Sequence, residues 1–581
     1  MGCCHSEGEA PNKGGVSRQK SVDETNGLQR NLIKKHKNRE YVWDKYQRGK
    51  LLGAGMTGSV HVGKHKETGE LYAIKSINKR KLDPAQIGEL KNEVDLLRRL
   101  DHPSIVRLYE VFEQGSKMYL IMQLLSGKDL GKARFKNELE VATVMYKICQ
   151  AIAYCHANGI CHRDIKLENF VFTSKNNHED ICVIDFGIGK KLHKSSRNRQ
   201  VTETKKQFKR NMHTICGTPY YMSPQVLEGR YDEKCDCWAL GVLAYILLTG
   251  KPPFNGRSKK ELDNAIRHGS VRFHRKISHD AKEFISHLLK INTNERWSAS
   301  RALKATWFHQ VISPPNDAKA LELEQSAIDN IMHYQEAGKL KKIALMIRAF
   351  SLQNKKIEKL KAAFGLMDTG NTGTLTKNEL SNALHRHNIF IDSEKIFESL
   401  DVDGHGVISY TEFLAAALGD DLEDDRVVLK SLFDKMDLSK NGRITAKDLK
   451  IFLGADAKKF NVEELVSEAD MTGSHDISYA EFVHVMTKDL HSTTSASASG
   501  TTGSYIVSRA DNPVKTRQDT VKELAARDKS KSKSGKKNPQ TLDSSAAGMM
   551  VSRPRVSITV APAAIPEEDN DSMRENEKAT V

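Results

Sequence analysis

The 581-residue chain has no long apolar run and few cysteines for its length. Its longest apolar stretch, from Cys237 to Leu248, is too short to cross a bilayer and predicts a buried helix. The nine cysteines form no CxxC pair and no secretory leader precedes them, which indicates reduced thiols and a cytosolic setting. No helix-turn-helix, RNA-binding or zinc-finger pattern accompanies the net charge of +16. We therefore expect neither a membrane span nor a nucleic-acid partner.

Composition divides the chain into several segments. Because a domain usually has about 100 to 200 residues, the length predicts three or more units. Residues 1–42 are polar and without periodicity, which predicts a flexible arm. Residues 46–308 alternate apolar strands with helical stretches, residues 313–355 have a helical pattern, and residues 356–488 form a repeat. Residues 489–581 are rich in Ser, Thr and Lys and predict a disordered tail.

The first residues, MGCCHS, match the pattern for acylation of Gly2, and Cys3 and Cys4 are placed to carry a second, thioester-linked chain. One myristoyl chain holds a protein only marginally, so stable attachment needs a second lipid or the nearby basic residues Lys34, Lys35, Lys37 and Arg39. The alternative is an ordinary disordered start with two incidental thiols. We expect a cytoplasmic protein held at the cytosolic face of a membrane.

A glycine-rich hairpin opens the second segment. The stretch KLLGAGMTGSV places Gly53, Gly55 and Gly58 before Val60, as in G-x-G-x-x-G-x-V, where glycine lets backbone N–H groups approach phosphates closely. A dinucleotide-binding turn has similar glycines but continues into a helix. Here a second strand, LYAIK, ends in Lys75 instead, which favours the phosphate-covering hairpin.

Lys75 requires an anionic partner, because an unpaired buried lysine is strongly destabilising. Glu93, in the helical run ELKNEVDLLRRL, is the natural partner, and such a pair orients the lysine onto the α and β phosphates of ATP.

The stretch CHRDIKLENF has the spacing of a phosphoryl-transfer loop. Asp164 is placed to accept the proton of the attacking hydroxyl, and Lys166 to steady the transferring phosphoryl group. Asn169 and Asp185, the latter in Asp185-Phe186-Gly187, are expected to hold Mg²⁺.

In this order the motifs resemble those of eukaryotic protein kinases, and GTPYYMSPQ at 217–225 and YDEKCDCWALGV at 231–242 extend the resemblance. The resemblance implies an α+β two-lobed kinase fold, transfer to serine or threonine, and catalytic roles for Lys75, Glu93, Asp164 and Lys166. The nucleotide-binding residues that it implies are Leu52, Gly53, Ala54, Gly55, Met56, Thr57, Gly58, Ser59, Val60, Ala73, Lys75 and Met122.

Two departures from the kinase pattern are visible. Ser223-Pro224-Gln225 replaces Ala-Pro-Glu, so the ion pair with an arginine, here Arg296, becomes a neutral hydrogen bond worth about 1 kcal/mol. Gln123 follows Met122 where an acid is common. Neither position takes part in phosphoryl transfer, so we expect an active kinase with a less rigid C-lobe.

The segment between Asp185 and Gln225 is long and basic, which predicts a solvated insertion. Thr214 matches a position where related kinases carry an activating phosphothreonine, and a phosphate there would pair with Arg163. Asp129 and Glu168 match positions that face basic substrate residues in related kinases, although each is equally able to cap a local helix. We expect protein substrates with Arg or Lys upstream of the acceptor Ser or Thr.

Residues 356–488 contain four stretches that fit the twelve-residue EF-hand loop, in which oxygen ligands at positions 1, 3, 5, 7, 9 and 12 surround Ca²⁺ and glycine at position 6 makes the turn. The loop starts are separated by 33, 36 and 33 residues, and predict an all-α calmodulin-like domain with hands at 356–390, 391–423, 424–459 and 460–488. The expected ligands are Asp368, Thr372, Thr374 and Glu379 in loop one, Asp401, Asp403, His405, Val407 and Glu412 in loop two, Asp437, Ser439, Asn441, Arg443 and Asp448 in loop three, and Asp470, Thr472, Ser474, Asp476 and Glu481 in loop four.

The four loops differ in ligand quality. Loop two has three ligating carboxylates, so we expect it to bind Ca²⁺ most tightly. Gly370 at position 3 weakens loop one, and His475 at position 6 of loop four costs roughly 1 kcal/mol or more through positive φ. For these two loops a structural hand without metal remains open. The apolar residues at position 8 predict that the loops pair into two lobes: Leu375, Ile408, Ile444 and Ile477.

The stretch NIMHYQEAGKLKKIALMIRAFSL at 330–352 joins the two regions. Its apolar residues at helical spacing are Leu340, Ile343, Ile347 and Phe350, with Lys341, Lys342 and Arg348 beside them. A basic amphipathic helix next to a calmodulin-like module is typical of that module's own target, and a plain linker helix is the alternative.

With this junction the chain resembles the calcium-dependent protein kinases over about residues 46–488. The resemblance implies that residues 313–355 block the kinase at rest and that Ca²⁺-loaded lobes remove them. We expect a monomeric Ca²⁺-activated serine/threonine kinase that uses Mg-ATP. The alternatives are a Ca²⁺-dependent membrane scaffold, against which Lys75, Asp164 and Asp185 argue, and a kinase with nearly Ca²⁺-independent activity.

Replacing Gly2 with Ala removes the acylation site, so the variant is expected to move from the membrane to the soluble fraction of lysed cells. Immunoblots of the two fractions measure the shift. A wild-type chain that is already soluble would show that the arm is not an anchor.

Overall fold

The computed structural model describes residues 32–37, 41–55, 58–175, 180–186, 190–191, 219–230, 232–273, 276–312, 318–352, 354–419 and 426–487. All of these residues belong to one unit of the chain. Several predicted features lie outside them, namely the lipidation residues Gly2, Cys3 and Cys4, the loop residues Met56 and Thr57, the phosphorylation candidate Thr214, and residues 489–581.

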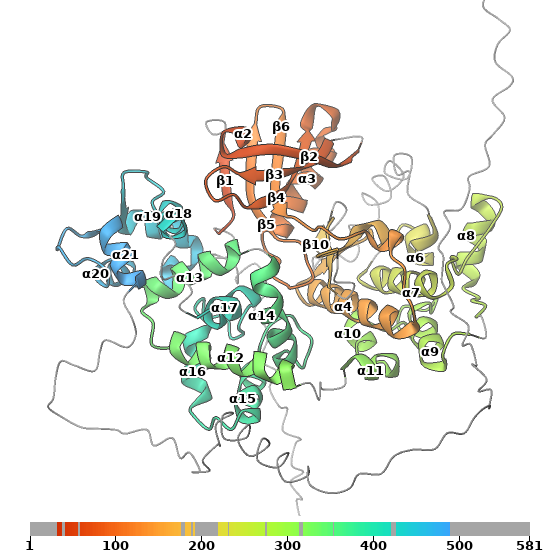
Figure 1. Ribbon diagram of the computed structural model, residues 1–581. Helices are drawn as coiled ribbons and strands as arrows, with labels where there is room; N and C mark the ends of the chain where they lie inside the picture. Colours follow the sequence, from red (N-terminus) through yellow and green to blue (C-terminus); the bar gives the residue numbers. More distant parts are fainter. Residues whose placement is uncertain are drawn as a thin grey trace, which may run out of the picture. The chain divides into compact units, whose positions relative to one another are not determined.

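A six-stranded sheet carries the glycine-rich hairpin, with strand order β1-β5-β6-β4-β3-β2 (Figure 1). β1 pairs with β5 in parallel and all other neighbours are antiparallel. The helix α3 begins with Pro84 after Asp83, whose carboxylate caps the first turn. The elements of this lobe are β1 (Lys34–Lys37), α2 (Val42–Lys45), β2 (Tyr46–Ala54), β3 (Gly58–His65), β4 (Leu71–Asn78), η1 (Lys79–Lys81), α3 (Pro84–Leu97), β5 (Leu108–Gln114) and β6 (Lys117–Gln123).

The strand β1 lies inside the segment that the sequence assigns to a flexible arm. Leu32 and Ile33 are buried. The His36 ring stacks on Phe112 with 4.1 Å between centroids, and its Nε2 lies 3.3 Å from Oε2 of Glu110. For residues 32–37 the prediction of a flexible arm is therefore wrong. So short a strand, paired with residues more than seventy positions away, has no local signal in the sequence.

The second lobe of the kinase region is mainly helical. Its central helix α7 contains the Cys237–Leu248 run, and its residues from Cys235 to Leu247 are buried, as predicted for that run. The elements are η2 (Leu130–Lys132), α4 (Glu138–Ala157), β7 (Ile160–Cys161), η3 (Leu167–Asn169), β8 (Phe170–Phe172), β9 (Ile181–Val183), β10 (Lys190–Lys191), η4 (Pro219–Tyr221), α6 (Pro224–Leu227), α7 (Lys234–Thr249), α8 (Lys259–His268), α9 (His279–Leu288), α10 (Ala299–Ala302), η5 (Thr306–Phe308) and α11 (His309–Ile312). Among the described helices, none is long and apolar enough to cross a membrane.

The region after Ile312 consists of helices and two short strands. α12 (Ala318–Tyr334) and α13 (Lys339–Ser351) divide the predicted junction in two, and α12 packs against α14 and α17. The EF-hand elements are α14 (Asn354–Met367), α15 (Lys377–Arg386), α16 (Ser393–Leu400), α17 (Tyr410–Ala417), α18 (Arg426–Met436), β11 (Arg443–Thr445), α19 (Ala446–Leu453), η6 (Gly454–Lys458), α20 (Val462–Ser467), β12 (Asp476–Ser478) and α21 (Tyr479–Thr487).

The four loops pair as the sequence predicts. Leu375 bridges Ile408 between loops one and two, and Ile444 pairs with Ile477 between β11 and β12 of loops three and four. The two-lobed arrangement of the hands is therefore confirmed within the described residues.

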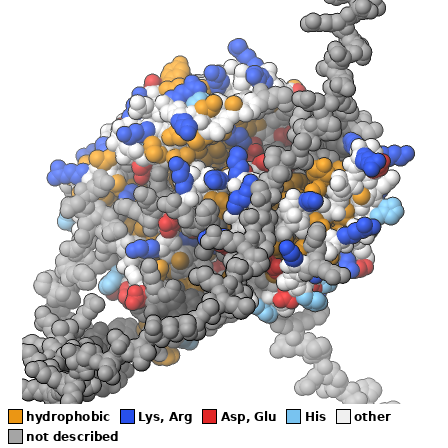
Figure 2. Space-filling model, turned by 45° about the vertical axis from the view of Figure 1, so that its right-hand side comes forward, with side chains coloured by type: hydrophobic (Ala, Val, Ile, Leu, Met, Phe, Trp, Pro, Cys, Tyr) orange, Lys and Arg blue, Asp and Glu red, His pale blue; other side chains and the backbone are white. Residues whose placement is uncertain are grey.

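On the face drawn in Figure 2, Lys and Arg side chains are spread over the described surface, with acidic side chains among them. The Lys and Arg side chains of the described residues form no single patch on this face.

Candidate active site and calcium-binding loops

The glycine-rich hairpin joins β2 to β3, and its three glycines meet different surroundings. A Cβ atom on Gly58 would lie 1.8 Å from the carbonyl oxygen of Ser76, so β4 permits only glycine there. Gly53 and Gly55 have no atom within 4 Å of the same position, which leaves room for a phosphate group. Behind the hairpin, Ala73 and Met122 pair across β4 and β6. The predicted nucleotide-binding residues that the structure describes thus lie on adjacent strands.

Lys75 on β4 reaches Glu93 on α3, with 3.2 Å between Nζ and Oε1, as the sequence predicts. Its Nζ also lies 3.6 Å from Oδ1 of Asp185. Burial would lower the pKa of Lys75, but the two carboxylates outweigh it and raise this pKa above its ordinary value. Lys75 is therefore charged at physiological pH and placed to bind phosphate oxygens.

The catalytic loop brings Asp164, Lys166 and Asn169 together. Nζ of Lys166 donates to Oδ2 of Asp164 at 2.7 Å, and Nδ2 of Asn169 donates to the backbone oxygen of Asp164 at 2.7 Å. Because the amide nitrogen of Asn169 is used in this way, its amide oxygen is the atom left for Mg²⁺, which accepts oxygen ligands. The residues present fit the predicted Mg²⁺ site of Asn169 and Asp185.

Asp236 at the start of α7 holds the backbone of this loop in place, a role that the sequence motifs did not predict. Its carboxylate accepts the backbone N–H groups of His162 and Arg163, both at 2.8 Å, and it lies 2.8 Å from Nε2 of His156. Burial would raise the pKa of Asp236, but the contact with His156 outweighs it and lowers this pKa to about 2. The signal in the sequence was an acid inside the buried run YDEKCDCWALGV, which an apolar helix tolerates only if the acid has partners.

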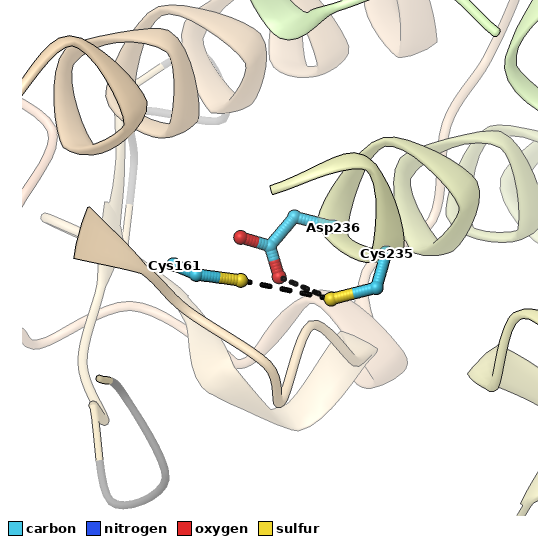
Figure 3. Close-up of side chains that lie close together, drawn as sticks. All are labelled: Cys161, Cys235 and Asp236. Carbon is cyan, nitrogen blue, oxygen red and sulfur yellow. Dashed lines mark hydrogen bonds between the residues drawn. The ribbon is translucent and has the colours of Figure 1, made fainter. Parts of the chain in front are cut away.

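Two thiols lie beside Asp236 (Figure 3). Cys161 comes from β7 and Cys235 from α7, and their sulfurs are 3.6 Å apart. Both carboxylate oxygens of Asp236 accept hydrogen bonds from the catalytic loop, so this cluster is explained as a structural support rather than as a metal site.

Four further predicted positions concern the C-lobe, the substrate and regulation. Nη2 of the buried Arg296 donates to Oε1 of Gln225 at 2.8 Å, so the predicted hydrogen bond between these residues is confirmed. The carboxylate of Asp129 caps η2 and pairs with Lys132 at 2.6 Å, which is the local-cap alternative. Glu168 is exposed beside the catalytic loop. Thr214, the predicted partner of Arg163, lies outside the described residues.

Loop two gathers the strongest candidate Ca²⁺ ligands. One oxygen each of Asp401, Asp403 and Glu412 lie within 4.8 Å of one another. Gly404 and Gly406 give this loop its two positive φ values, 66° and 80°. A cluster of three carboxylates at this spacing fits a divalent cation that prefers oxygen, so the residues suit Ca²⁺. His405, the predicted ligand at position 5, contacts Asp403 and lies 3.1 Å from Nζ of Lys459.

Loops three and four keep their predicted acids at both ends. In loop three, Oγ of Ser439 donates to Asp437 and to Asp448, both at 3.2 Å. In loop four, His475 has φ of 60°, the strained conformation that the sequence predicts. The remaining predicted ligands occupy their loop positions: Asn441 and Arg443 in loop three, and Asp470, Thr472, Ser474, Asp476 and Glu481 in loop four.

Comparisons with known proteins agree with this geometry. The protein kinase domain family matches residues 46–308, and the EF-hand domain pair matches residues 357–418 and 426–487. Calcium-dependent protein kinase 5 of Plasmodium falciparum (isolate 3D7) is 34% identical over 462 residues, which cover 77% of this chain and 78% of the relative. Calcium-dependent protein kinase 34 of Arabidopsis thaliana is 32% identical over 466 residues, covering 77% and 85%.

The chain belongs to the calcium-dependent protein kinases. This calcium-dependent protein kinase is a calcium-activated serine/threonine kinase that uses ATP, Mg²⁺ and Ca²⁺.

Asp164 is placed to accept the proton of the substrate hydroxyl, and Lys166 and Lys75 are placed to orient the phosphates and balance their charge. Asn169 and Asp185 would hold Mg²⁺, which would supply further charge stabilisation. Asp236 keeps Asp164 in place by holding the backbone of the two preceding residues.

Replacing Asp236 with Asn puts an N–H₂ group against one of the N–H donors of the catalytic loop, so kcat is expected to fall by about 10- to 100-fold. Steady-state kinetics measure the loss, and the number of Ca²⁺ ions bound should not change. Glu233→Gln, at the N-cap position of α7 and outside these contacts, is the matched control. Equal kcat for both variants would show that Asp236 does not position the loop.

Proposed function

We propose that residues 318–352 act as a brake within the molecule. Without Ca²⁺ they hold the kinase inactive, and the Ca²⁺-loaded hands take α13 into their own groove, which shifts the population toward the active form. The observation that supports this proposal is the enclosure of α13 by the helices of the EF-hand region, at the same time as Lys75 pairs with Glu93.

The apolar residues of α13 are buried among these helices. Leu340, Ile343, Ile347 and Phe350 are each no more than 4% exposed, and α13 packs against α17 and α18. Ala344, Leu345 and Met346 are buried as well, so the covered surface is wider than the stripe that the sequence predicts. Burial of the apolar face of a basic amphipathic helix is what capture by a calmodulin-like groove requires.

The kinase region contacts the captured helix at its C-terminal end. Nη1 of Arg107 donates to the backbone oxygens of Ala349 and Phe350, at 3.1 and 3.2 Å, and the guanidinium lies 5.1 Å from the centroid of the Phe350 ring. Asp101, 3.5 Å from Arg107, accepts the backbone N–H of Thr411 at 2.7 Å. These contacts support a state in which the captured helix α13 and the helix α17 also stabilise the kinase region.

Two finer features complete the proposal. Glu168, exposed beside the catalytic loop, supports a preference for Arg or Lys upstream of the acceptor residue. Acylation of Gly2, with Cys3 or Cys4, places the enzyme at a membrane, supported by the MGCCHS pattern. A monomer suffices for the brake, because the groove and its target lie in one chain.

Replacing Ile343 with Asp puts a charge at a fully buried position of α13, so capture is expected to fail. Turnover with Ca²⁺ should fall at least about tenfold, toward the value measured with chelator. Lys339→Ala, on the exposed side of the same helix, is the control and should leave activation within about twofold. Full activation of Ile343→Asp would contradict the proposal.

Lys342 makes capture depend on pH. Burial in the groove lowers its pKa to about 8, against a weaker opposing effect of Glu468, whereas the released helix has the ordinary pKa. Capture therefore releases a proton, and raising the pH through 8 is expected to lower the Ca²⁺ concentration for half-activation. Lys342→Met removes this group, so half-activation measured from pH 7 to 9 should shift less than in the wild type. Identical shifts would show that Lys342 is not buried in the active form.

A further inference from the structure

Loop one, residues 368–379, lacks ligands for Ca²⁺ that loop two has. Position 3 is Gly370, which has no side-chain oxygen. Oγ1 of Thr372 at position 5 donates to the backbone oxygen of Thr374, at 2.9 Å, although position 7 normally offers that oxygen to the metal. Loop one thus has two carboxylates, Asp368 and Glu379, where loop two has three.

The same loop makes direct contacts with the kinase helix α4. Oδ1 of Asn371, at position 4, accepts hydrogen bonds from Oη of Tyr146 at 2.7 Å and from Nε2 of Gln150. These two donors lie one helical turn apart on α4 and converge on one acceptor. Asn371 has φ of 53°, a conformation that asparagine tolerates better than most residues.

Position 6 of the loop is pressed against the kinase as well. A Cβ atom on Gly373 would lie 2.4 Å from Cδ2 of His102 and 2.9 Å from Cδ2 of Tyr154, the next residue along the same face of α4. The corresponding glycines of loops two and three, Gly406 and Gly442, have no atom within 4 Å of this position. Among the described loops with glycine at position 6, close contact between that glycine and the kinase is thus found in loop one.

An ion pair ties the preceding helix to the same part of the kinase. Nζ of Lys361 on α14 lies 3.2 Å from Oδ1 of Asp180, which Lys147 of α4 also contacts at 2.7 Å. All three side chains are largely buried, so this contact is shielded from solvent.

We propose that loop one is a docking loop for helix α4 of the kinase and not a calcium site. Its Asn371 binds Tyr146 and Gln150, and the ligands that it lacks are those that Ca²⁺ would need. The number of Ca²⁺ ions bound does not depend on the brake proposed above. The effect of docking on activity rests on that proposed function.

Ion counting on the full-length chain tests the first half of this proposal. Equilibrium dialysis with ⁴⁵Ca is expected to give the same number of ions for the wild type and Glu379→Gln, and at least one fewer for Glu412→Gln, the same change in loop two. A lower count for Glu379→Gln than for the wild type would overturn the proposal.

A double-mutant cycle between Tyr146→Phe and Asn371→Ala tests the contact itself. Each single variant is expected to raise the Ca²⁺ concentration for half-activation about three- to tenfold, and the double variant no more than either, because both remove the same contact. Lys440→Ala, at position 4 of loop three, is the control and should combine additively with Tyr146→Phe.

The cycle is also measured as thermal unfolding in saturating Ca²⁺, which needs no turnover. If the brake does not exist, the Ca²⁺ concentration for half-activation no longer measures the Tyr146–Asn371 contact. The coupling between the two substitutions in the unfolding temperature persists in that case. Additive effects of Tyr146→Phe and Asn371→Ala in the unfolding temperature would overturn docking through this loop.

Discussion

The captured helix α13 is held at both ends by charges of the sign that its dipole favours. Glu468 lies at the N-terminal end, where its Oε2 accepts the N–H of Leu340 at 3.4 Å, and Arg107 lies at the C-terminal end on the last carbonyl oxygens. Glu468 belongs to the EF-hand region and Arg107 to the kinase. Both regions thus stabilise the helix in this position, and the proposed regulatory arrangement depends on these contacts.

The N-terminal end of α17 makes a second connection between the kinase and the EF-hand region. Asp101, paired with Arg107, binds the N–H and the hydroxyl of Thr411 in the first turn of α17, and Thr411 precedes Glu412, the last ligand of loop two. The backbone that carries Asp101 follows α3, the helix of Glu93. Two hydrogen bonds thus connect loop two to the backbone that follows α3.

The residues that carry the chemistry could be predicted from the sequence, whereas most residues that hold them in position could not. Lys75, Asp164, Asn169 and Asp185 lie in motifs whose residues are close in sequence, and each EF-hand loop is a local unit, so spacing alone identified them. Asp236, Asp101 and Asn371 act through contacts with residues far along the chain, which no local pattern records. β1 was missed for the same reason, because its pairing with β5 is remote and its residues are basic rather than apolar.

Turnover of a basic peptide by three forms of the enzyme tests the central claim most directly: the full-length chain with Ca²⁺, the full-length chain with chelator, and a chain without residues 313–488. Removal of the brake should give the shortened chain a higher turnover than the chelated full-length chain. Loss of the helices that Arg107 and Asp101 bind should keep it below the Ca²⁺-loaded enzyme. A shortened chain no faster than the chelated full-length chain would contradict the account.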